Sequence, residues 1–113
     1  MPASSVSGSP APHRLEIARA AERKPFMAKV QYRRGIMRAQ VEVLDVSVLG
    51  AKVECHDILR CGDVIWLTLP GLSPLEAVVA WAEGFTFGCR FVRPLYAAVF
   101  DALIERRRAE IGW

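Results

Sequence analysis

The chain has few of the residues on which catalytic sites are most often built. Its 113 residues include two histidines, and His13 lies in an N-terminal stretch rich in Ser, Pro and Ala. His56 is therefore the one histidine in the more apolar part of the chain. A Ser/His/Asp or Cys/His catalytic site is therefore poorly supported. The sequence also has no Gly-rich phosphate loop of the nucleotide-hydrolase type. We expect no enzyme activity.

Cysteine is also scarce, and this argues against metal sites and disulfide scaffolds. Three cysteines occur, with no Cys-x-x-Cys pair among them. Cys55, His56 and Cys61 lie near one another in the sequence, but their spacing is not that of a zinc finger. We expect core or surface roles for them, with no bound metal and no cofactor. An odd cysteine count favours the reducing cytoplasm over a disulfide-stapled secreted module.

Long hydrophobic runs and strong charge are missing as well. No stretch is apolar enough to span a bilayer, and no hydrophobic run follows a basic start as in a secretion signal. The formal net charge is +3, which permits an anionic ligand but does not suggest a protein that coats a polynucleotide. We expect a soluble, cytoplasmic protein without a polynucleotide partner.

What the chain does have is enough apolar material for one packed domain, since its hydrophobic content is 52%. Residues 1–13 lack apolar periodicity and are predicted to be a disordered tail. Residues 14–24 are charged and Ala-rich and are predicted to be a short ligand-binding arm that ends before Pro25. Residues 25–113 carry the patterns of the folded domain.

Alternating apolar and polar residues in that domain predict strands. Val41 and Val43, for example, alternate with Gln40 and Glu42. The predicted strands are 26–32, 36–46, 51–55, 64–69, 75–82 and 85–92, with 33–35 as a turn. The nearly all-apolar stretch 64–69 is predicted to be either buried on both sides or packed under the helix. Pro94 is predicted to open an amphipathic α-helix. The fold class is therefore mainly β: a six-stranded antiparallel β-barrel with a flexible N-terminal arm and a C-terminal helix.

The alternation slips where Val43 and Leu44 are adjacent, which predicts a β-bulge near Leu44. Beyond the bulge Asp45 and Ser47 share one face of the strand, and bulges often re-aim side chains beside binding sites. Asp45 supplies an acceptor and Ser47 a hydroxyl, and Gly50 lets the backbone turn closely.

Upstream stands an arginine pair, Arg19 and Arg23. Planar guanidinium groups suit phosphates and the O6/N7 edge of guanine. A ligand that uses the arginines together with the Asp45–Gly50 segment would carry both guanine and phosphate.

These motifs and their order resemble a known family. Arg19-Ala20-Ala21-Glu22-Arg23, Asp45-Val46-Ser47-Val48-Leu49-Gly50 and the hairpin Trp81-Ala82-Glu83-Gly84 with Phe87-Gly88-Cys89-Arg90-Phe91 are similar to those of the PilZ domain. PilZ domains are receptors for the bacterial second messenger cyclic di-GMP. The resemblance covers roughly residues 19–108.

The resemblance implies a role for each matched residue. Arg19 and Arg23 would fold over the dinucleotide and contact its phosphates and a guanine Hoogsteen edge. Asp45 would accept hydrogen bonds from a guanine Watson–Crick edge, and Ser47 would add a hydroxyl contact. Gly50 would hold the turn and leave room for the ligand. Trp81 lies either at the rim of the pocket or in a purely structural position.

The implied function is a single-domain receptor or adaptor that switches a partner in trans, with motility, adhesion or polysaccharide-synthesis machinery as candidate targets. One alternative is a PilZ-like protein–protein adaptor that does not bind nucleotide, against which the intact motifs argue. Another is a small barrel that binds single-stranded nucleic acid, which needs exposed aromatics. Phe85, Phe87 and Phe91 are predicted to face inward. Both a monomer and a dimer are compatible with the sequence.

Overall fold

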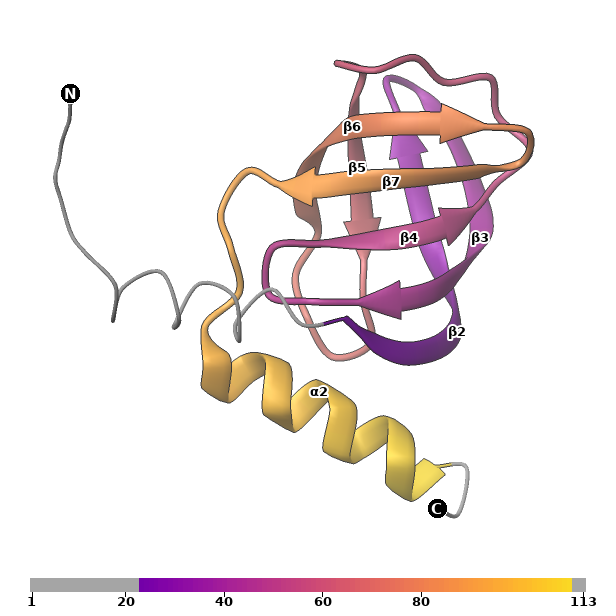
Figure 1. The fold of residues 1–113 in the computed structure, drawn as a ribbon. Coiled ribbons are helices and arrows are strands. Elements are labelled where there is room, and N and C mark those ends of the chain that lie inside the picture. The colour runs from indigo at the N-terminus through magenta and orange to yellow at the C-terminus, as the bar shows by residue number, and fades with distance from the viewer. Residues whose placement is uncertain (1–22, 111–113) are drawn as a thin grey trace, which may run out of the picture.

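The computed structural model describes residues 23–110 and shows a closed antiparallel barrel with one helix beside it (Figure 1). The six strands follow one another around the barrel in the order β2-β3-β4-β7-β6-β5. Their bounds are β2 Lys24–Arg34, β3 Met37–Val46, β4 Gly50–Glu54, β5 Val64–Thr68, β6 Leu75–Glu83 and β7 Thr86–Phe91, and helix α2 spans Ala97–Glu110. The predicted fold class is confirmed. The predicted tail and most of the predicted arm, including Arg19, lie outside the described residues.

Along each strand, every second side chain points into the barrel and packs in its core. Val41 and Val43 point inward as expected, with 6% and 0% of their surface exposed. In β5, Ile65 and Leu67 are fully buried, whereas Val64 is exposed and Trp66 only partly buried. Burial of this stretch on both sides, one of the two predicted arrangements, was wrong, because a barrel strand has a core face and an outer face.

Two turns also differ from the prediction. Arg33 and Arg34 belong to β2 and pair with Arg38 and Met37, so the turn begins at Gly35, whose φ of 61° needs a glycine. Phe85 does not face inward. It sits in the β6–β7 turn with 61% of its surface exposed.

Helix α2 begins three residues later than predicted. The Leu95 N–H donates to the Val48 carbonyl (2.8 Å), which ties the segment after Pro94 to the β3–β4 turn before the helix can start. Phe100 and Leu103 bury the helix's apolar face. In the described part of the chain this helix is too short and too polar to cross a membrane.

A partly buried carboxylate fastens the loop after β4 to the barrel. Asp57 accepts hydrogen bonds from Arg34 Nε (2.6 Å), Arg34 Nη2 (2.9 Å) and the Tyr32 hydroxyl (2.7 Å). The bonds from Arg34 are the main cause that lowers the pKa of Asp57 to about 2, with the Tyr32 bond adding to it. Burial and the same carboxylate raise the pKa of Tyr32 above its ordinary value.

This carboxylate predicts an acid-sensitive stability. Since the pKa of Asp57 is lower in the folded chain, its contribution is complete above pH 4 and is lost as the pH falls from about 4 to about 2. Because Arg34 is 40% exposed, we expect a loss of about 1–2 kcal/mol. Urea unfolding across this range measures it. Asp57→Asn should be less stable at pH 7 and should not show this loss of stability at low pH. If the variant lost stability at low pH as the wild type does, Asp57 would not be its cause.

The cysteines differ in accessibility. Cys55 and Cys89 are buried and Cys61 is exposed, and all three are free thiols. Burial raises the pKa of Cys89 to about 11 and raises that of Cys55 as well. At pH 8 about one Cys89 thiol in a thousand is then a thiolate.

We therefore expect a thiol reagent to label one cysteine rapidly in the native chain and all three in urea. Cys61→Ser should abolish the rapid phase. Rapid labelling that survives this substitution would contradict the burial of the other two thiols.

Candidate functional site

Two β-bulges turn two polar-tipped side chains from the core to the outer face. The β3–β4 register shifts between Val43 and Asp45, and the β6–β7 register shifts between Val79 and Trp81. By strict alternation Asp45 and Trp81 would follow Val43 and Val79 into the barrel. The extra residue in each strand reverses this, so both side chains reach the outside. The bulge predicted near Leu44 is confirmed.

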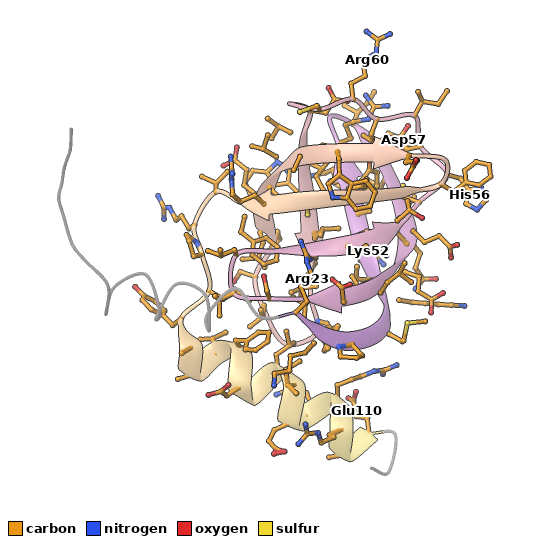
Figure 2. All side chains as sticks on the ribbon, in the orientation of Figure 1. Arg23, Lys52, His56, Asp57, Arg60 and Glu110 are labelled. Carbon is orange, nitrogen blue, oxygen red and sulfur yellow. The ribbon has the colours of Figure 1, made fainter. Side chains whose placement is uncertain are left out.

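Strand pairing places these two residues in one line. Asp45 pairs with Lys52, Lys52 with Gly88, and Gly88 with Trp81. This cross-strand line over β3, β4, β7 and β6 is called the binding row below. Figure 2 shows Lys52 and Arg23 on the same outer face of the barrel.

Arg23 closes one end of the binding row. Its Nη1 lies 2.9 Å from Asp45 Oδ1, and the two side chains are 49% and 23% exposed. A partly exposed pair with one such contact contributes about 0–1 kcal/mol. The pair is therefore weak enough to be exchanged for a ligand, and it brings together two of the predicted site residues.

Ser47 is placed differently from Asp45. It is 3% exposed, and its hydroxyl oxygen accepts the N–H groups of Leu49 (3.1 Å) and Gly50 (3.2 Å). Its own N–H donates to the Gly50 carbonyl (2.8 Å). Ser47 therefore shapes the β3–β4 turn that follows Asp45. Its contact with a ligand stays a prediction.

Gly50 is needed because two backbones approach closely. It pairs with Arg90, and a Cβ added to Gly50 would overlap the carbonyl oxygen of Cys89. The glycine of the motif thus allows β4 to pair with β7 at this point. Arg90, which pairs with Gly50 and is exposed, lies beside the binding row as a further cation.

Trp81 lies against Gly88. A Cβ on Gly88 would overlap the indole nitrogen, so the bare glycine lets the ring sit close to the sheet with 40% of its surface exposed. An indole at this position offers a stacking surface at the end of the binding row opposite Arg23.

Gly88→Ala is therefore expected to push the indole into solvent. In a chain whose Trp66 and Trp113 are replaced by phenylalanine, Trp81 fluorescence should shift to the red and become easier to quench with acrylamide. Gly84→Ala in the same hairpin is the control, because no atom lies within 4 Å of a Cβ built there and its φ of 60° adds only backbone strain. Equal spectra for the two variants would show that Gly88 does not set the position of Trp81.

Sequence reasoning missed Lys52 and Arg90 as site residues and assigned no role to Gly88. Alternation already indicated that Lys52 and Arg90 point outward, since Ala51, Val53 and Cys89 are the inward residues. What was lacking is the register, because only strand pairing shows that these residues adjoin Asp45 and Trp81. Arg19, the remaining predicted site residue, lies outside the described part of the chain.

Comparison with known proteins identifies the family. The family model of the PilZ domain matches residues 18–106, which include the binding row, Arg23 and Ser47. None of the curated proteins compared with the chain matches it. PilZ domains are generally non-enzymatic receptors or adaptors for cyclic di-GMP. Since the match spans most of the sequence and the fold agrees with it, the chain belongs to the PilZ domain family.

Proposed function

We propose that this chain is a cyclic di-GMP receptor and that the ligand lies along the binding row. The observation that carries the proposal is the assembly of Arg23, Asp45, Lys52 and Trp81 on one exposed surface, two of them turned outward by bulges. The family match supplies the ligand class.

The side chains in and beside the binding row suit different parts of the ligand. The Asp45 carboxylate accepts hydrogen bonds, and a guanine Watson–Crick edge offers N–H groups on adjacent ring positions. Lys52 and Arg90 offer cations to the phosphates. Stacking of a base on the Trp81 indole contributes about 1–3 kcal/mol.

Ligand binding requires Arg23 to be shared or released by Asp45. The ion pair of 2.9 Å is replaced by bonds from Arg23 to the ligand and from the ligand to Asp45. Each charge-assisted hydrogen bond contributes about 1.5–3 kcal/mol, more than the exposed ion pair that it replaces. Arg19, four residues before Arg23, is proposed to join it on the ligand.

The output of binding is proposed to be a partner protein switched in trans within the cytoplasm. By family analogy the targets are motility, adhesion or polysaccharide-synthesis machinery. Such a switch needs a partner whose affinity differs between the free and the bound receptor.

Mapping the ligand on the isotope-labelled chain tests this placement. Titration with cyclic di-GMP should move the amide signals of Asp45, Lys52, Gly88 and Trp81. Cyclic di-AMP is the control, because adenine presents an acceptor nitrogen where guanine presents N1–H and would face the Asp45 carboxylate unfavourably. Equal responses to both nucleotides, or shifts confined to other surfaces, would contradict the proposal.

A further inference from the structure

The end of the barrel away from α2 carries exposed apolar side chains. Phe85 in the β6–β7 turn is 61% exposed, and Ile58 in the loop after β4 is 86% exposed. Together with His56 they line a hollow of about 190 Å³. Figure 2 shows His56 and Asp57 at this end of the barrel, apart from Arg23.

This apolar surface is held in place before any partner binds. Asp57 is fastened to Arg34 and Tyr32, as described above. The Cys55 N–H donates to the Phe85 carbonyl (2.7 Å), which joins the loop to the β6–β7 turn. The His56 ring stacks on Phe85 with 4.5 Å between centroids and 26° between planes. Little conformational entropy would be lost on binding, so contacts made here convert efficiently into affinity.

A line of carboxylates adjoins the hollow. Glu42 pairs with Glu54, Glu54 with Thr86, and Thr86 with Glu83. Like charges directly opposite one another on paired strands are unfavourable. Within residues 23–110 none of these three glutamates forms a salt bridge, although Lys29 stands opposite Glu42 on β2. The surface beside the hollow therefore carries carboxylates that no salt bridge neutralises.

We propose that this end of the barrel is the docking surface for a partner protein, in the form of a basic segment that carries an aromatic or branched aliphatic side chain. The apolar side chain enters the hollow beside Phe85 and Ile58, and neighbouring Lys or Arg residues meet Glu54 and Glu83. The charge of the surface selects this occupant, because the carboxylates repel acidic peptides and anionic lipid headgroups. The inference does not require that the chain bind a nucleotide.

The test uses the full chain, isotope-labelled, and a short synthetic peptide in which Arg alternates with Leu and Phe. We expect saturable amide shifts confined to residues 54–58 and 83–86, with a Kd below about 1 mM. The matched peptide with Glu in place of Arg should not bind. Added salt should weaken binding of the Arg peptide, because part of its attraction to the chain is electrostatic.

Variants separate the apolar contribution from the charge. Phe85→Ala should weaken binding of the Arg peptide about tenfold, because an aromatic side chain at the centre of an interface is a typical hot spot. Ile36→Ala is the control, since Ile36 is 99% exposed in the neighbouring turn but does not line the hollow. Glu54→Gln combined with Glu83→Gln should weaken binding and reduce its salt dependence.

Several results would overturn the proposal. They are the lack of saturable shifts, shifts on another surface, equal binding of the Glu peptide, or equal effects of Phe85→Ala and Ile36→Ala. Shifts of the same residues on concentrating the chain alone would assign the surface to a second copy instead. Thermal unfolding of each variant checks that the fold is intact.

Discussion

Arg23→Ala is expected to weaken binding of cyclic di-GMP by about 30- to 100-fold, which corresponds to about 2–3 kcal/mol. The substitution removes charge-assisted hydrogen bonds to the ligand and leaves the Asp45 carboxylate without its partner at 2.9 Å. Because the side chain of Arg23 is 49% exposed, the stability of the barrel should fall by no more than about 1 kcal/mol. Calorimetric titration and thermal unfolding of the same preparation measure the two effects.

Two further variants make the interpretation specific. Arg38→Ala removes an exposed arginine from the β2–β3 hairpin and should leave the affinity unchanged. Arg23→Lys keeps the charge but loses the planar set of donors, so an intermediate loss is expected. If Arg23→Ala and Arg38→Ala weakened binding equally, the effect would reflect net charge and not a site at Arg23.

Gly50→Ala is expected to produce the largest loss of stability, about 3 kcal/mol or more. The new Cβ would overlap the Cys89 carbonyl, a backbone atom that can move only if β4 and β7 separate. Since small domains are stable by about 5–15 kcal/mol, this one methyl group removes a large part of the total. Urea unfolding gives the loss directly.

Gly35→Ala is the matched control for this prediction. Gly35 has a φ of 61°, and no atom lies within 4 Å of a Cβ built there, so only backbone strain of about 1–2 kcal/mol is expected. Gly50→Ala should therefore cost clearly more than Gly35→Ala. Equal losses of stability would mean that β4 and β7 can shift to make room for a side chain at position 50.

The barrel could be predicted from the sequence because its strands show themselves in patterns of neighbouring residues. Inward residues such as Val41 and Val43 recur at every second position, and the adjacent Val43 and Leu44 already marked the bulge. The side of β5 that faces solvent could not be predicted, because Val64 and Trp66 are as apolar as the core residues beside them. Only closure of the barrel decides which face is inside.

The candidate site was predicted in part, for the same physical reason. Asp45 and Arg23 were recognised by their motifs, and the structure brings them together. Lys52 joins them only through strand register, which a single sequence does not record. Ser47 was placed on the face of Asp45 by alternation, but the β3–β4 turn draws its hydroxyl inward to bind two backbone N–H groups.

The central claim is tested most directly by calorimetric titration of the wild-type chain with cyclic di-GMP, paired with thermal unfolding at saturating nucleotide. The account predicts saturable heat with a Kd in the micromolar range or tighter and a raised melting temperature. Asp45→Ala should abolish both signals while the barrel stays folded. A wild-type chain that gives neither heat nor a thermal shift would contradict the receptor function and favour an adaptor that works without the nucleotide.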